Sequence, residues 1–167
     1  MGLFLHLVPE ASVARIRRNG ITRMRRPAGQ LPKRIYATPV TRNFYASHQW
    51  LRELKRFHPG PLAGIYFRIS DEQIVWVGHY GQNHQQLTAA QAVAMFSAAA
   101  DPLGWEVLIP RRIMPEEIVR VRRLPQVIGW RFYPNAKGRV PCTCDFCIRG
   151  EYGAAKLRKR LRSPDRD

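Results

Sequence analysis

Apolar and polar positions alternate along most of the chain in runs of five to eight residues, which is typical of β-strands with one buried face. The first run, "LFLHLVP", places a histidine among aliphatic residues, and "WEVLIP" places a glutamate in the same way. Strands are expected at 3–7, 34–40, 63–69, 73–80, 105–110 and 117–124, with 127–133 as a further candidate.

Three other segments have apolar residues at helical spacing. Pro9 and Glu10 suit the first turn of a short helix that ends before Gly20, and Thr41 is placed to cap the next one. Thr88 and Gln91 have the spacing of a capping box. These signals predict helices at 9–19, 42–57 and 87–100.

The order of these elements predicts an α+β fold, in which the adjacent runs 63–69 and 73–80 form a hairpin or sheet pair. A chain of 167 residues favours a single domain, expected at 1–140. A Cys-rich clip is expected at 141–150, and a basic helix and tail at 151–167.

Net charge is the global property of the sequence that says most about its partners. The chain holds 28 basic and 12 acidic residues, a net charge of +16, and the part before Gly150 alone carries +13. A field of this sign favours a polyanionic partner, RNA or DNA, through phosphate contacts and counterion release. The alternative is an arginine-rich composition with much of the charge merely solvated.

No run of the sequence has the length of a membrane span or the pattern of a signal peptide. We therefore expect a soluble, cytoplasmic protein with no membrane partner. Cys142, Cys144 and Cys147 lie within six residues, which indicates metal or redox chemistry more than a disulfide framework. Structural zinc is one interpretation, with a fourth ligand from His58, His79 or His84, and three unligated thiols are the other.

Taken singly, the polar residues inside the strands have ordinary explanations. His6 is either a core histidine with a hydrogen-bond partner or part of a site. Alternation puts Glu106 on the face opposite Trp105 and Val107, where it points either to solvent at a sheet edge, the reading that spacing favours, or into a cleft. Tyr36 and Tyr45 suit core packing with a tethered hydroxyl.

Their order along the chain is more informative. "LFLHLVPEASVARIRRNGI", "KRIYATPVTRNFYAS" and "WEVLIPRRIMPEEIVRV" together resemble the ADP-ribosyltransferase fold, specifically the His-Tyr-Glu group that includes diphtheria toxin and the poly(ADP-ribose) polymerases. The chain departs from the family in having Leu7 after the histidine, where a glycine is usual, and in the shorter gap between its two tyrosines. The resemblance implies split mixed β-sheets with flanking helices.

It also implies that NAD is the substrate. His6 would hold a hydroxyl of the adenosine-side ribose and the carboxamide region, while Tyr36, helped by Tyr45, would stack on nicotinamide. Glu106 would bond the 2′-hydroxyl of the reacting ribose and stabilise its developing positive charge. The basic loop after the first helix would meet the pyrophosphate through Arg23, Arg25 and Arg26, unless these side chains are simply solvated.

The expected function is therefore an NAD-dependent ADP-ribosyltransferase that modifies a nucleic acid. By family resemblance it would be a toxin or phage-defence effector with an antitoxin as a further partner. One alternative is an NAD-dependent RNA 2′-phosphotransferase of the same fold, for which His48, His79 or His84 would serve. The other is a non-catalytic nucleic-acid-binding protein held together by a zinc clip.

Overall fold

The strands form a single antiparallel sheet. The computed structural model describes residues 1–25, 33–55, 57, 58 and 60–124, apart from the side chains of Phe44 and Tyr45. Within these ranges seven strands lie in the order β5-β4-β6-β2-β1-β3-β7, and every pairing is antiparallel. Their bounds are β1 Leu3–Pro9, β2 Ile35–Pro39, β3 Leu62–Arg68, β4 Ile74–His79, β5 Gln85–Thr88, β6 Trp105–Ile109 and β7 Ile118–Arg123.

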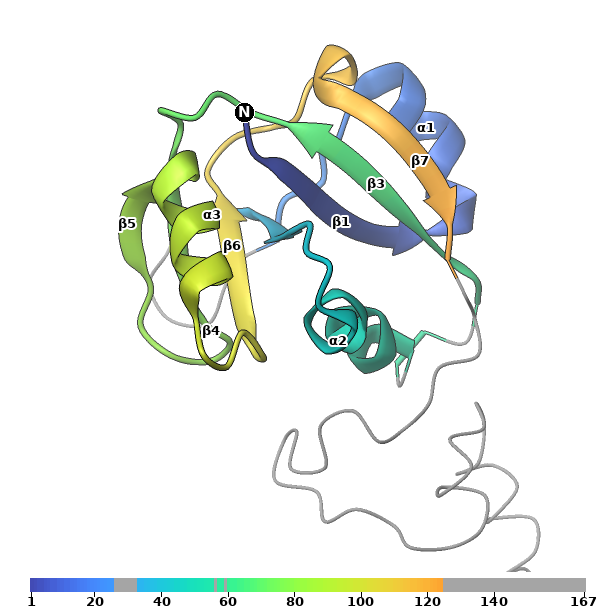
Figure 1. Ribbon diagram of the computed structural model, residues 1–167. Helices are drawn as coiled ribbons and strands as arrows, with labels where there is room; N and C mark the ends of the chain where they lie inside the picture. Colours follow the sequence, from blue (N-terminus) through green and yellow to red (C-terminus); the bar gives the residue numbers. More distant parts are fainter. Residues whose placement is uncertain (26–32, 56, 59, 125–167) are drawn as a thin grey trace, which may run out of the picture.

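The α+β class is confirmed, whereas the expectation of mixed strand directions is wrong for the described strands. The sheet does come close to dividing between β1 and β2. Seven residue pairs join β1 to β3, but β1 and β2 are joined by the two pairs Phe4↔Pro39 and Leu5↔Thr38. Figure 1 shows the two halves, with β1, β3 and β7 on one side and β4, β5 and β6 on the other.

The predicted pairing of the runs 63–69 and 73–80 is wrong. These runs became β3 and β4, which lie in different halves of the sheet. Strand β3 has β1 on one side and β7 on the other, so both of its edges are occupied. The turn that begins at Ser70 instead leads the chain to the other half, where β4 lies between β5 and β6. Strand β5 was not predicted, because its sequence "QQLT" lacks an apolar run.

Three α-helices accompany the strands, α1 Val13–Asn19, α2 Phe44–Lys55 and α3 Ala89–Ala98. The first is preceded by a 3₁₀ turn at Glu10–Ser12, and a second such turn, Pro115–Glu117, precedes β7. The predicted capping box is confirmed: Thr88 Oγ1 accepts from the Gln91 backbone N–H, and Gln91 Oε1 accepts from that of Thr88. This box fixes the start of α3 directly after β5.

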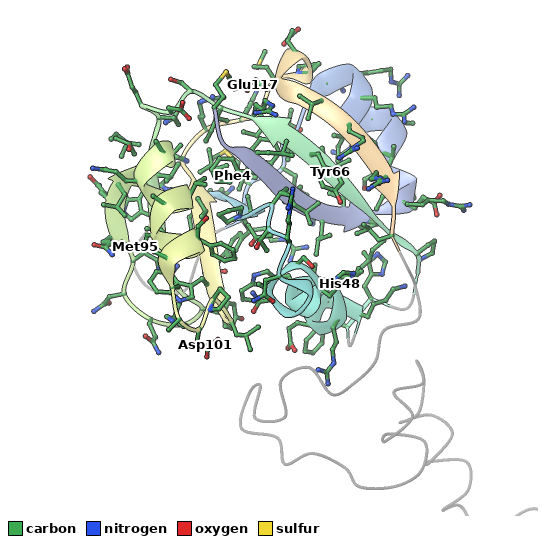
Figure 2. All side chains as sticks on the ribbon, in the orientation of Figure 1. Phe4, His48, Tyr66, Met95, Asp101 and Glu117 are labelled. Carbon is green, nitrogen blue, oxygen red and sulfur yellow. The ribbon has the colours of Figure 1, made fainter. Side chains whose placement is uncertain are left out.

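One face of the sheet carries the hydrophobic core. Its fully buried members come from both halves and from the adjoining helices, and they include Phe4, Ile65, Phe67, Val77, Ala92, Val107 and Ile109. Phe4 and Phe67 stack with ring centroids 5.9 Å apart across β1 and β3. Figure 2 shows Phe4 in the middle of the molecule, surrounded by closely packed side chains. This shared core holds the two halves together where their backbone pairing is sparse.

The segment after α1 is attached to the segment between β6 and β7. Gly20 has φ +72°, and a Cβ at this position would lie 2.1 Å from the carbonyl oxygen of Ile113. Because only glycine permits this close approach, the backbone N–H of Ile21 can donate to that carbonyl at 2.8 Å. The bridge leads the chain back toward β2, where Arg25 and Arg34 exchange backbone hydrogen bonds.

Basic side chains gather on the outside of α1 and β7. Arg15, Arg17 and Arg18 on the helix are exposed, as are Arg120 and Arg122 on the strand. Arg120 also lies over the ring of Tyr66, 5.1 Å from its centroid. Among the described residues no helix has the length and apolarity needed to cross a membrane. The candidate strand 127–133, the Cys-rich clip and the basic tail lie outside the described residues.

Candidate active site

Glu106 lies in the second position of β6, an interior strand flanked by β4 and β2. The residue is 6% exposed, so the expectation of a carboxylate pointing to solvent at a sheet edge is wrong. Its neighbours in the strand, Val107 and Ile109, belong to the hydrophobic core on the opposite face. Burial raises the pKa of Glu106 to about 7, well above its ordinary value of 4.5.

His84 supplies the hydrogen-bond partner of this carboxylate. Its Nε2 lies 3.1 Å from Glu106 Oε1, and the two side chains are 6% and 7% exposed. Burial lowers the pKa of His84, and a hydrogen bond with the backbone of Gln82 opposes that effect. An acid with a raised pKa and a base with a lowered pKa are therefore in contact in a buried setting, a pattern common at functional sites.

Tyr36 lies on the same face of the sheet as Glu106. In antiparallel strands, residues paired across the ladder point to the same side, and Tyr36 of β2 pairs with Leu108, two residues beyond Glu106. Burial raises the pKa of Tyr36, and the charge of Glu106 and the neighbouring Tyr80 raise it further. The structure thus brings together the tyrosine and the glutamate that the sequence placed 70 residues apart.

His6 lies where β1 and β2 diverge. The last pair between these strands is Leu5↔Thr38. At the next position the His6 side chain makes the contact with β2, with Nδ1 2.6 Å from the Tyr36 carbonyl oxygen. Because a carbonyl only accepts, Nδ1 carries the proton and Nε2 of the neutral ring is left as an acceptor. Burial and the charge of Arg25 lower the pKa of His6, although the Tyr36 carbonyl opposes them. His6 is thus a half-buried histidine hydrogen-bonded to the backbone of Tyr36, and along β1 it lies on the same face as the core residues Phe4 and Val8.

Of the three arginines assigned to the basic loop, Arg25 is the one that the structure connects with the site. Its charge acts on both His6 and Tyr36, lowering the pKa of each. Arg23 is exposed and has no contact with the site among the described residues, while Arg26 lies outside them. Next to Arg25, the Arg34 guanidinium stacks over Trp76 at 4.3 Å.

Tyr45 was expected to be the second aromatic residue of the site, and its side chain lies outside the described part of the chain. Tyr80, which sequence reasoning did not single out, acts electrostatically on Tyr36 and lies 5.7 Å from the ring of Trp50. Trp50 is fixed by a hydrogen bond from its Nε1 to the Trp105 carbonyl. The sequence signal for Tyr80 was its place as an aromatic residue at the end of an alternating strand, "VWVGHY".

The remaining histidines do not gather with Glu106 in the described residues. His79 packs against Trp105, with ring centroids 4.7 Å apart, and His48 hydrogen-bonds Ser47. No group of three or more His, Cys, Asp or Glu side chains placed to hold a metal occurs in the described ranges. Cys142, Cys144 and Cys147 lie outside those ranges, as would any site that they form.

Together these residues offer a specific set of chemical groups. Glu106 provides a carboxylate that can balance a developing positive charge, and His6 provides an oriented acceptor nitrogen. Tyr36 and Tyr80 provide aromatic rings for a planar ligand, and Arg25 provides a positive charge for an anionic one. Comparison of the chain with protein-family models, curated proteins and solved structures finds no match.

Proposed function

We propose that this protein is an NAD-dependent ADP-ribosyltransferase that modifies a nucleic acid. The observation that carries the proposal is the buried pair of Glu106 and His84 on the sheet face that also presents Tyr36. A carboxylate removed from water is costly unless it has a role or a partner, and this one lies beside the ring expected to stack on nicotinamide. The near-division of the sheet between β1 and β2 agrees with the split sheets of the fold that the sequence resembles.

The proposed reaction breaks the bond between nicotinamide and ribose. Nicotinamide leaves with the electron pair of that bond, and an acceptor oxygen or nitrogen of the nucleic acid forms the new bond to C1′ and releases its proton. Glu106 accepts a hydrogen bond from the 2′-hydroxyl and balances the positive charge on the ribosyl centre. His6 accepts a hydrogen bond from a ribose hydroxyl at Nε2, Tyr36 stacks on the departing nicotinamide, and Arg25 faces the pyrophosphate.

A nucleic-acid acceptor is supported by charge. The chain carries a net charge of +16, and exposed arginines lie on both α1 and β7. Such a surface attracts phosphates irrespective of sequence. A cytoplasmic toxin or phage-defence effector with a cognate antitoxin remains the biological role that the family resemblance suggests.

The test incubates the purified full chain with NAD labelled in its adenylate phosphate and with separate pools of RNA, DNA and protein. We expect label in one nucleic-acid pool and a loss of about 10² to 10³-fold in Glu106→Gln, because the positive charge is then no longer balanced. Glu72→Gln, at an exposed position, is the matched control and should label normally. A chain that neither binds nor consumes NAD contradicts the proposal.

The same assay separates the alternatives. An RNA 2′-phosphotransferase would remove the phosphate from a 2′-phosphorylated RNA in an NAD-dependent manner without labelling it, and would tolerate Glu106→Gln. A non-catalytic binding protein would retain RNA or DNA with a steep salt dependence and ignore NAD.

A structural zinc ion is a separate proposal that rests on the spacing of Cys142, Cys144 and Cys147. Metal analysis of the purified full chain should find nearly one zinc per molecule, lost in Cys144→Ser. A folded chain without metal would contradict it. His84 is a poor candidate for the fourth ligand, because its Nε2 already faces Glu106.

A further inference from the structure

The contact between His84 and Glu106 is unusually well enclosed for a residue in a polar loop. His84 directly precedes β5, in the segment "GQNHQQ", yet its side chain is only 6% exposed. The second oxygen of the carboxylate, Oε2, has no hydrogen-bond partner among the described residues. The histidine thus occupies one oxygen of Glu106 and leaves the other available.

Gly78 makes this approach possible. It pairs with Glu106 across β4 and β6, so any side chain here would stand beside the carboxylate. A Cβ at position 78 would lie 2.7 Å from the Asn83 carbonyl oxygen and 3.1 Å from both Cα and Cγ of His84. The loop folds back over β4 because there is no side chain at this position, and this brings the imidazole to Glu106.

The proton count of the pair follows from its partners. The hydrogen bond with the Gln82 backbone favours the protonated ring, so the Gln82 group is an accepting carbonyl; since Nε2 faces Glu106, we assign Nδ1 as the donor to it. Nε2 then either accepts a hydrogen bond from a neutral Glu106 or, as an imidazolium, donates one to its carboxylate. Both arrangements place a single proton between Nε2 and Oε1. The proposed chemistry requires an ionised Glu106, and in that form of the pair the imidazolium is the donor.

We propose that His84 is a positioning residue for Glu106: it holds Oε1 through one shared proton and thereby directs Oε2 toward the ribose of the substrate. This inference rests on the proposed function for its catalytic meaning. The other titratable groups that act on this corner of the sheet are Tyr36 of β2, Tyr80 after β4 and Arg25, whose charge reaches Tyr36. None of the three replaces His84 as a hydrogen-bond partner of Glu106 within the described residues.

The kinetic test compares His84→Ala with His84→Gln in the full chain. The alanine variant leaves the buried carboxylate without a donor, so we expect kcat for labelling to fall about 10²-fold at pH 7, with KM for NAD within about threefold of wild type. The rising limb of the plot of kcat against pH should move to higher pH by about one unit, because the unpaired carboxylate ionises less readily. The glutamine amide can donate a hydrogen bond to Oε1, so His84→Gln should recover most of kcat and the wild-type position of the rising limb.

Gln85→Ala is the matched control, since this exposed neighbour of His84 hydrogen-bonds Met95 and not Glu106. It should leave both kcat and the limb unchanged. Equal pH profiles for wild type and His84→Ala would overturn the inference.

A second measurement does not require turnover. The side-chain carboxyl of Glu106 can be titrated by ¹³C NMR in the full chain, with Glu106→Gln identifying its resonance. We expect a midpoint near pH 7 in wild type, a higher one in His84→Ala and an unchanged one in His84→Gln. Gly78→Ala, which changes no ionisable group, should raise the midpoint by displacing His84.

Identical midpoints in wild type, His84→Ala and Gly78→Ala would overturn the inference even in an active enzyme. An inactive wild-type chain with the expected midpoints would instead overturn the proposed function and leave the contact itself established.

Discussion

Alternate residues of the same strands lie on opposite faces of the sheet, and the two faces differ in what they contribute to the protein. On one face Ile35, Val107 and Ile109 join a core that spans both halves of the sheet. On the other face the intervening residues Tyr36 and Glu106 form the candidate active site. The first face gains stability by removing apolar surface from water, whereas the second holds groups whose burial is unfavourable. The comparison predicts that substitutions on the two faces change stability with opposite signs.

The largest effect is expected on the core face. Phe67 is fully buried and stacks on Phe4, so Phe67→Ala should lower the free energy of unfolding by about 3 to 5 kcal/mol through lost burial and a residual cavity. Denaturant titration of the full chain measures this change. Labelling per folded molecule should stay within about twofold of wild type, and a loss of activity larger than the loss of folded protein would show that the two faces are not separable.

On the site face, Glu106→Gln should stabilise the protein. A pKa raised from 4.5 to about 7 means that the folded state binds the proton more tightly than the unfolded state, so this group's contribution is fully favourable below pH 4.5 and is lost as the pH rises through 7. Glutamine does not titrate, so the variant should be more stable by about 3 kcal/mol at pH 8.

The same variant should match wild type at pH 4.5. Unfolding at both pH values gives the comparison, and Glu72→Gln serves again as the exposed control. Equal stabilities at pH 8 would mean that Glu106 is better solvated than its 6% exposure indicates.

The smallest effect is expected at a position that touches neither set of residues directly. Thr88→Ala removes the side-chain half of the capping box at the start of α3 and should cost about 1 kcal/mol. Thr88→Ser retains the accepting oxygen and should recover most of that loss, as thermal or denaturant unfolding would show. Labelling should be unaffected by either variant, because α3 packs on the core face.

Local patterns were enough to predict much of the framework. The capping box of α3 and the alternation of β6 were both visible in the sequence, because helix starts and strand faces depend on residues a few positions apart. The same alternation separated Glu106 from the core residues beside it. It did not determine whether the carboxylate met solvent, because that depends on which strands flank β6.

The errors share one cause. The pairing of β3 with β4 was expected from their adjacency in the chain, but the partners of β3 come from the N-terminus and from β7. His84 was seen as a polar loop residue or a metal ligand, since nothing within a few residues of it indicates a partner 22 positions away. Tyr80 was missed for the same reason, because its neighbours Tyr36 and Trp50 come from distant parts of the chain.

Sequence patterns alone were enough to predict the α+β class, the positions of most strands and all three described helices, the strongly basic surface, and which residues of each strand share a face. These properties follow from periodicity, capping and charge, all of which are local or additive. The folded structure was needed to establish that β1 and β2 diverge at His6, that β6 lies inside the sheet, and that the absence of a side chain at Gly78 allows His84 to reach Glu106. Burial and hydrogen-bond partners arise from contacts between distant segments, and a pattern read along one segment does not contain them.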